Sequence, residues 1–203
     1  MTACGRVRGL VLTGGRSSRF GGVHKPGVRV GGVPVLARVH AALTAVPVDG
    51  IWVAGPADGI PDDLRAGVHE VQEEPRFGGP LAGIAAAVAD MPPAPDAVVL
   101  VLAGDVPYTD PADLTHLAHT CAQTGRAVAS ADATGRRQHL CAAWPDALLR
   151  ARLEDVGDPT DLPVRLLWEG VDPVQVAVST ASLEDFDTED DLRRITGSTR
   201  PGA

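Results

Sequence analysis

The segment Ala97–Ala103 constrains the fold of this chain most strongly. It reads AVVLVLA, contains no polar side chain, and lies between a proline-rich connection at 92–95 and a turn sequence that begins at Gly104. A short apolar run of this kind is typical of a strand whose two faces are both covered. Because parallel sheets are covered by helices on both faces, the segment predicts the centre of an α/β sheet.

Shorter strand-like and helix-like segments alternate on both sides of this run. Strands are predicted at 9–12, 51–54, 68–71 and 174–178, and helices at 35–45, 61–64, 81–90, 163–168 and from 111 onward. Two more β-like segments, 126–130 and 139–144, could form a hairpin or an extension of the sheet. We therefore predict an α/β fold, a Rossmann-like three-layer αβα sandwich whose mostly parallel sheet carries a small β extension.

The composition fits one domain with its own core. The chain has 203 residues, of which 44% are hydrophobic, and no repeat or interdomain linker is evident. We expect a single domain over residues 1–197 and a disordered tail at 198–203. The three cysteines lack metal-site spacing, which fits a reducing cytoplasm, and no targeting segment is visible.

The charge and the aromatic content exclude several classes of partner. The formal net charge is -8 and aromatic residues make up only 3% of the chain. We therefore expect no nucleic-acid partner and no anionic membrane partner, because both need a basic surface. No apolar run approaches the ~20 residues that span a bilayer. A polyanionic nucleotide could bind only through local cations and a divalent metal.

A glycine-rich, cationic stretch follows the first predicted strand. Residues 8–25 read RGLVLTGGRSSRFGGVHK, so the strand ends in paired glycines and then in arginines and a lysine. Paired glycines let backbone N–H groups approach an anion, and Arg and Lys add charge-assisted contacts to phosphate. The spacing matches neither a P-loop nor the dinucleotide fingerprint. The stretch predicts a triphosphate cradle, and a plain turn with solvated arginines is the alternative.

A second glycine loop, at 73–80, precedes the predicted helix at 81–90. Its sequence is EEPRFGGP, and Glu74 could accept hydrogen bonds from the hydroxyl or amino groups of a nucleoside. The alternative is a solvated turn whose acidic residues favour the helix start.

Asp105 follows the central strand directly. Asp110 has a structural task, because Asp110 and Pro111 read as the N-cap and first residue of a helix, whereas Asp105 has none. A carboxylate at the carboxyl end of a central strand lies where open α/β sheets bind ligands, and it suits Mg²⁺. A simple turn is the alternative.

Asp187 is a second candidate for a metal ligand. It stands beside a helix-capping pattern from Thr188 to Asp191.

Five motifs in order resemble one family over nearly the whole chain. They are LVLTGGRSSRFGGVHKP, GGVPVLARV, GGPLAGI, VLAGDVP and DFDTEDDL. The chain resembles the molybdenum cofactor guanylyltransferases and related nucleotidyltransferases. The resemblance implies a single nucleotidyltransferase domain that binds GTP and Mg²⁺. It also implies transfer of GMP to the phosphate of molybdopterin (molybdenum) cofactor, with release of pyrophosphate.

The resemblance implies a role for individual residues. Base and ribose would be bound by Leu12, Thr13, Gly14, Gly15 and Glu74, or Glu73 beside it. The catalytic residues would be Lys25 and Arg19, which neutralise the triphosphate, and Asp105, the main metal ligand, with Asp187 near the metal. The acceptor phosphate is already a nucleophile, so positioning and charge neutralisation suffice and no general base is needed.

Because of two departures from the family pattern, the sequence does not determine which nucleotide is bound. His24 replaces a usual Asp, and Ala54 stands where guanylyltransferases can carry a polar base-contacting residue. A cytidylyltransferase, transfer to another phosphorylated acceptor, and a non-catalytic nucleotide-binding module remain alternatives. A sugar-phosphate nucleotidyltransferase would need a longer chain. We expect a monomer or small homo-oligomer that could contact molybdoenzymes or cofactor-handling proteins transiently.

Overall fold

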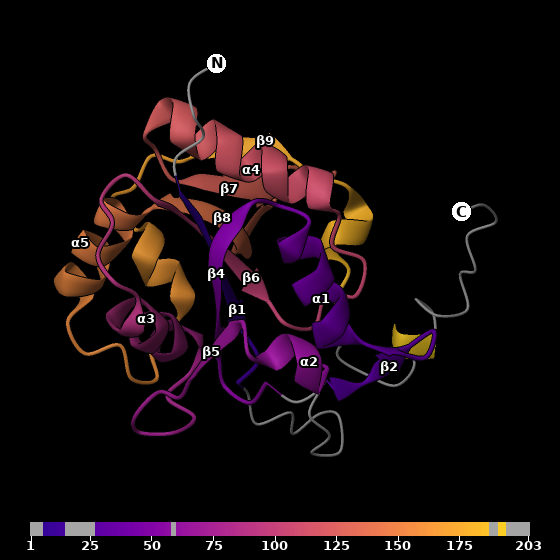
Figure 1. The fold of residues 1–203 in the computed structure, drawn as a ribbon. Coiled ribbons are helices and arrows are strands. Elements are labelled where there is room, and N and C mark those ends of the chain that lie inside the picture. Colours follow the sequence, from indigo (N-terminus) through magenta and orange to yellow (C-terminus); the bar gives the residue numbers. More distant parts are fainter. Residues whose placement is uncertain (1–5, 15–26, 58–59, 187–190, 194–203) are drawn as a thin grey trace.

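The computed structural model describes residues 6–14, 27–57, 60–186 and 191–193. Its centre is a seven-stranded sheet with the order β5-β4-β1-β6-β8-β7-β9 (Figure 1). The strands are β1 (Val7–Leu12), β4 (Val48–Ala54), β5 (Val68–Val71), β6 (Val98–Ala103), β7 (Val128–Ala131), β8 (Arg137–Pro145) and β9 (Val174–Ala177). The run predicted to be the central strand is β6, and it is the middle strand of the sheet.

Within this sheet every strand except β8 runs in the same direction. β1 pairs in parallel with β4 and β6, β4 pairs in parallel with β5, and β7 with β9. β8 is antiparallel to both of its neighbours, β6 and β7. The prediction of a mostly parallel sheet with a β extension is therefore confirmed, and the extension is part of the main sheet. A separate hairpin joins β2 (Arg29–Val30) to β3 (Val33–Pro34).

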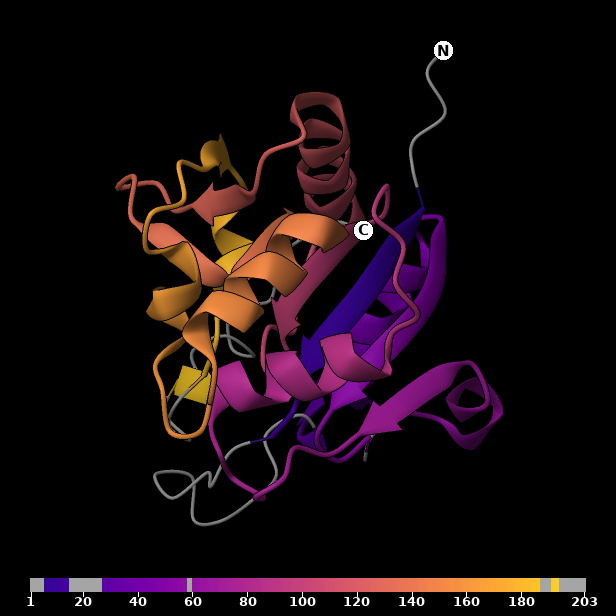
Figure 2. The same cartoon turned by 90° about the vertical axis from the view of Figure 1, so that its left-hand side faces the viewer.

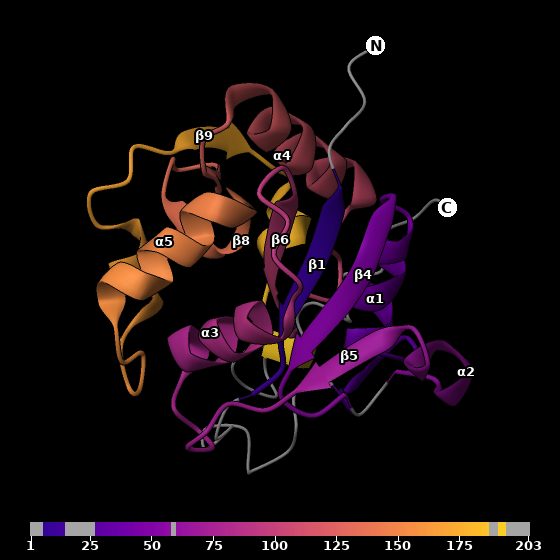
Figure 3. The same ribbon diagram turned by 60° about the vertical axis from the view of Figure 1, so that its left-hand side comes forward.

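Helices cover both faces of the sheet. They are α1 (Val35–Thr44), α2 (Asp62–Arg65), α3 (Pro80–Asp90), α4 (Pro111–Thr124), α5 (Asp146–Val156) and the 3-10 helices η3 (Val164–Trp168) and η4 (Thr180–Leu183). α1 and α4 pack on one face, and α3 and α5 on the other (Figure 3). In β6, Leu100 and Leu102 pack toward α1 and α4, whereas Val99 and Val101 pack toward α3 and α5. None of the described helices has both the length and the apolar character that crossing a bilayer requires.

The start of α4 shows the predicted cap. The Asp110 carboxylate accepts a hydrogen bond from the backbone N–H of Ala112 across 2.8 Å, and Pro111 occupies the first helical turn. This bond satisfies one of the N–H groups that a helix start leaves without a partner. Asp110 therefore has the structural role that its sequence context indicates.

α5 is not among the helices that the sequence pattern predicts. It begins at Asp146, directly after Pro145 at the end of β8. The Asp146 side chain is 1% exposed, and its carboxylate pairs with the Arg150 guanidinium across 2.9 Å. Arg150 also donates hydrogen bonds to the carbonyl oxygens of Val88 and Met91 near the end of α3. The ion pair lies within α5, and the two hydrogen bonds from Arg150 hold α5 against the end of α3.

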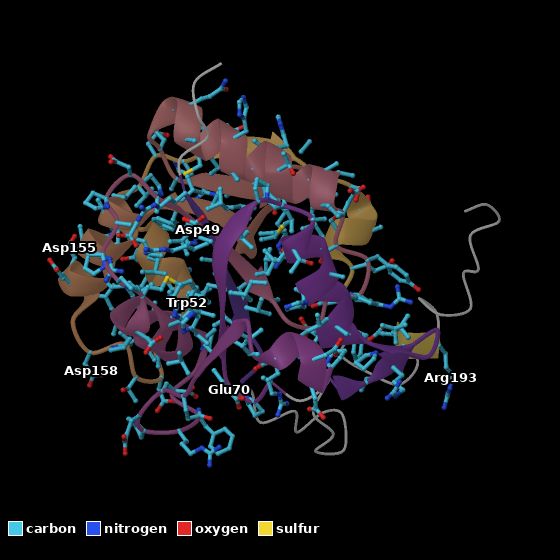
Figure 4. The ribbon with its side chains drawn as sticks, viewed as in Figure 1. Asp49, Trp52, Glu70, Asp155, Asp158 and Arg193 are labelled. Atoms are coloured by element: carbon cyan, nitrogen blue, oxygen red, sulfur yellow. The ribbon has the colours of Figure 1, made fainter. Side chains whose placement is uncertain are left out.

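Trp52 of β4, labelled in Figure 4, also contacts the end of α3. Its indole N–H donates to the Asp90 carboxylate across 2.9 Å, and its ring stacks on His69 with 4.5 Å between centroids. Because α3 is held at its end by Trp52 and Arg150, its start is kept in place over the carboxyl ends of β1 and β4.

Candidate active site

The carboxyl ends of β1 and β6 lie side by side. Leu12 is paired with Ala103 in the sheet, and the N–H of Gly104 donates to the carbonyl oxygen of Leu12 across 2.9 Å. A Cβ on Gly104 would lie 2.8 Å from that same oxygen, so the two chains leave the sheet in close contact. Asp105, which is half-buried, comes directly after Gly104 in the sequence, so it leaves the sheet near the turn that begins at Thr13. The structure brings these two predicted parts of the site together.

Thr13 joins the turn after β1 to the turn after β4. Its N–H donates to the carbonyl oxygen of Ala54 across 2.9 Å, and its hydroxyl donates to that of Pro56 across 2.8 Å. The residue is only 4% exposed. Its side chain therefore holds the turn together, and Thr13 is not among the residues that line the pocket described next.

A pocket of about 370 Å³ opens at this edge of the sheet. It is lined by residues from the ends of β1 and β4, the loop after β5, the start of α3 and the loop after α5. These residues are Leu12, Gly14, Ala54, Glu73, Phe77, Gly79, Pro80, Gly83 and Asp161. The predicted residues Leu12 and Gly14 therefore lie in one cavity with the second glycine loop. Small residues make the space, since a Cβ on Gly83 would already lie 3.2 Å from the Leu12 side chain.

Glu73, rather than Glu74, faces this pocket. Glu73 is 6% exposed, whereas Glu74 is exposed and lies outside the pocket lining. One Glu73 carboxylate oxygen accepts from the N–H of Phe77 across 2.9 Å, and the other accepts from the amide of Gln72 across 2.7 Å. Each carboxylate oxygen has a second lone pair, so Glu73 can hold its loop and still accept from a ligand.

The start of α3 borders the same pocket, because Gly79, Pro80 and Gly83 line it. Gly79 is the N-cap with φ +90, and no side chain caps the helix. Pro80 has no N–H, and the N–H of Gly83 already donates to the carbonyl of Gly79. The N–H groups of Leu81 and Ala82 belong to the first turn, where a helix provides no internal acceptor. An electron-rich group that comes within hydrogen-bond distance would satisfy them.

Two lining residues were not singled out from the sequence. Phe77 is 52% exposed and presents an aromatic ring at the pocket. Asp161 reaches the pocket from the loop after α5, where its N–H donates to the carbonyl oxygen of Gly78 across 2.8 Å. Figure 2 shows this loop, in orange, beside the loop that leads into α3. No local sequence signal marks Asp161, because only tertiary folding brings it to the pocket.

Several predicted site residues lie outside the described residues. They are Gly15, Arg19, Lys25 and Asp187. Within 6–14, 27–57, 60–186 and 191–193, no group of three or more His, Cys, Asp or Glu side chains could hold a metal ion. Asp105 is the predicted metal ligand that the structure describes. The expected contacts to triphosphate and metal stay predictions.

Comparison with known proteins assigns the chain to a protein family. The family described as the MobA-like NTP transferase domain matches residues 9–166. A probable molybdenum cofactor guanylyltransferase of Natronomonas pharaonis is 30% identical, with 94% of this chain and 96% of that protein covered. A molybdenum cofactor guanylyltransferase of Pseudomonas putida is also 30% identical, with 91% and 94% covered.

Solved structures share the fold. A nucleotidyl transferase from Methanothermobacter thermautotrophicus superposes with a TM-score of 0.72 at 26% identity, covering 95% of this chain and 96% of that one. Rv0371c from Mycobacterium tuberculosis, solved in complex with manganese, gives a TM-score of 0.68 at 20% identity, covering 97% of this chain and 100% of that one.

Proposed function

Because the chain belongs to the MobA-like NTP transferase domain family, we propose that it is a Mg²⁺-dependent guanylyltransferase. It would transfer GMP from GTP to the phosphate of molybdopterin cofactor and release pyrophosphate. The two guanylyltransferases that are 30% identical over most of both chains support this choice of nucleotide and acceptor.

One observation carries the proposal: a pocket of nucleoside size lies at the carboxyl end of β1, which contacts Gly104, the residue before Asp105. At about 370 Å³ it falls within the range of small-molecule sites, and it is built from both glycine loops that the sequence marks. Leu12 and Gly14 would contact the base or ribose, and Glu73 would accept from the base or ribose. The triphosphate would then extend toward Asp105, because Gly104 contacts the Leu12–Thr13 turn.

The chemistry needs few protein groups. An oxygen of the acceptor phosphate attacks the α-phosphorus of GTP, a new P–O bond forms, and the bond to the bridging oxygen breaks as pyrophosphate leaves. The acceptor phosphate is ionised at neutral pH, so no residue has to remove a proton. The protein therefore holds the two phosphates in line and neutralises charge. Lys25 and Arg19 would contact the triphosphate oxygens and stabilise the leaving pyrophosphate.

The donor chemistry of Asp105 fits a divalent ion. A half-buried carboxylate at the strand edge is a hard oxygen ligand, and Mg²⁺ is usually held by one or two carboxylates together with substrate phosphates. Asp187 would be the second carboxylate. When bound, the ion supplies charge neutralisation at the phosphate oxygens. The manganese complex of the Mycobacterium tuberculosis protein supports a divalent ion in this fold.

A pyrophosphate-release assay tests the proposal. Purified protein is incubated with Mg²⁺, molybdopterin cofactor and each of GTP, CTP, ATP and UTP in turn. Release with GTP alone is the expected result. Preference for CTP would replace the guanylyl assignment by a cytidylyl one. If nucleotide binds in calorimetry but no acceptor ever yields pyrophosphate, the chain is a binding module and the proposal fails.

We also propose a cytoplasmic location, supported by the sparse cysteines, Cys121 and Cys141 being buried free thiols. Delivery of the product would involve transient contact with molybdoenzymes or cofactor-handling proteins. The oligomeric state, expected to be a monomer or small homo-oligomer, can be measured by light scattering.

A further inference from the structure

Among the described residues that line it, the pocket contains two carboxylates and no basic side chain. Glu73 and Asp161 are its charged lining residues, and its other lining residues are apolar or glycine. A negatively charged group is therefore disfavoured in this cavity, whereas a neutral group rich in hydrogen-bond donors is favoured. The phosphates of a nucleotide would stay outside, and its base would be the part that enters.

The two carboxylates differ in what they already bind. Both oxygens of Glu73 accept hydrogen bonds within their own loop, from Phe77 and Gln72. Among the described residues, the Asp161 side chain has neither a hydrogen bond nor an ion pair. Asp161 is exposed and lines the pocket, so with respect to the described residues its carboxylate can accept from a molecule that binds there.

The backbone holds Asp161 in position before any ligand arrives. Its φ is +56, a left-handed conformation that Asp and Asn tolerate better than most residues. Its N–H is bonded to Gly78, and the preceding N–H of Thr160 donates to the Asp158 carboxylate across 3.0 Å. Figure 4 labels Asp158 on this loop. Hydrogen bonds from Thr160 lower the pKa of Asp158, which favours the ionised carboxylate that accepts from the Thr160 N–H.

Guanine is the base that matches this arrangement. Its N1–H and its exocyclic amino group are adjacent donors, which one carboxylate can accept together. Cytosine and adenine place a ring acceptor beside their amino group, and uracil has a single N–H between two carbonyls. The guanine O6 in turn is an acceptor for the N–H groups at the start of α3. Ala54, where a polar base-contacting residue was expected, offers no side-chain partner.

We propose that Asp161 is a specificity-determining residue that accepts hydrogen bonds from the N1–H and the 2-amino group of guanine. This inference rests on the proposed function, since it assumes that a guanine nucleotide occupies the pocket. A hydrogen-bonding role for Asp161 explains how the chain can select GTP although the Ala54 side chain cannot hydrogen-bond to the base.

Calorimetry with GTP and inosine triphosphate, which lacks the 2-amino group, tests the role of Asp161. In the unmodified chain GTP is expected to bind roughly ten- to a hundredfold more tightly than inosine triphosphate. In Asp161→Asn and Asp161→Ala this ratio falls to near one, while binding of CTP and ATP is unchanged. Asn suits the left-handed conformation, so the first variant keeps the fold, which thermal unfolding checks. Glu154→Gln, an exposed acid on α5 outside the pocket, is the matched control and should keep the ratio.

The outcomes separate the two proposals. If the unmodified chain prefers GTP and both Asp161 variants retain its preference over inosine triphosphate, Asp161 does not read guanine, and the guanylyltransferase proposal still stands. If the unmodified chain shows no preference for GTP over CTP or ATP, the proposed function itself fails and the inference fails with it.

Discussion

A Cβ atom on Gly55 would lie 2.5 Å from the backbone nitrogen of Gly14. The turn after β4 therefore passes directly over the turn after β1, and Gly55 adopts φ +109 to do so. The Thr13 hydroxyl, bonded to Pro56, secures the same crossing. This contact shapes the floor of the pocket, because Gly14 and Ala54 both line it.

Gly55→Ala is expected to weaken nucleotide binding and to lower the free energy of unfolding by about 1–3 kcal/mol, through the clash and the strained φ. Calorimetry and urea unfolding measure the two effects. Gly125→Ala is the control. Gly125 has φ +64 at the end of α4 but nothing within 4 Å, so only a stability loss of about 1 kcal/mol is expected. Native nucleotide affinity in Gly55→Ala would show that the crossing does not shape the site.

Substitutions of Asp105 and Asp110 are expected to have opposite effects: the first should lower the reaction rate, and the second should lower the stability. Asp105→Asn should leave thermal unfolding unchanged and lower the rate of pyrophosphate release by about a hundredfold or more, because charge stabilisation at the phosphates is lost. Asp110→Ala removes the cap of α4. It should lower the free energy of unfolding by about 1 kcal/mol and leave the rate unchanged. Unfolding of Asp105→Asn would argue against a metal-binding role for that carboxylate.

Lys25 lies outside the described residues, so its role is tested by rate alone. Lys25→Ala should reduce pyrophosphate release by about a hundredfold or more while circular dichroism stays native. Arg29→Ala serves as the comparison. That exposed side chain donates to the carbonyl of Gly32 in the β2–β3 hairpin. If both variants lose the same small amount of activity, the cationic stretch acts only as a diffuse charge.

The buried carboxylate of Asp146 is expected to matter for stability and not for catalysis. Arg150 lies 2.9 Å away and the buried Arg8 3.6 Å away, at the amino end of β1 and far along the strand from the pocket. Asp146→Ala leaves these cations without their partner and should lower the free energy of unfolding by about 3–5 kcal/mol. Asp172→Ala, which breaks the exposed pair with Arg126, should cost about 1 kcal/mol or less. Equal losses in urea unfolding would refute this assignment.

Stability should fall as the pH is lowered through the histidine range. Burial lowers the pKa of His40 below its ordinary 6.5, and burial together with Arg137 and Arg136 lowers that of His139. The unfolded chain then binds more protons than the folded chain, so the stabilisation is complete above the unfolded pKa and is lost below it.

Urea unfolding at about pH 7.5 and about pH 5.5 measures this loss. His40→Leu should reduce the difference between the two values, because the residue is buried on α1 and its buried Nδ1 has no hydrogen-bond partner among the described residues. A pH dependence identical to that of the unmodified chain would mean that His40 is not protonated on unfolding.

Local patterns were enough to predict much of this fold. The apolar run of β6 is the middle strand because each of its faces meets helices, and only a continuous apolar sequence satisfies both. Asp110 caps α4 because its accepting carboxylate and the donating N–H of Ala112 lie two residues apart. Both glycine loops border the pocket because parallel strands deliver their carboxyl ends to one edge. These features depend on neighbours in sequence, which is why the sequence by itself determines them.

Only the tertiary structure determines three other features: which glutamate faces the pocket, where α5 packs, and how Asp161 reaches the pocket. Whether Glu73 or Glu74 faces the pocket depends on a hydrogen bond to the Phe77 N–H within an irregular loop, where no periodicity assigns a face. α5 is fixed by ion pairs and carbonyl contacts with segments distant in sequence. Asp161 enters the pocket only because its N–H bonds to Gly78 on another loop. Such contacts join residues far apart along the chain, and their energy exists only once the folded layers have brought them together.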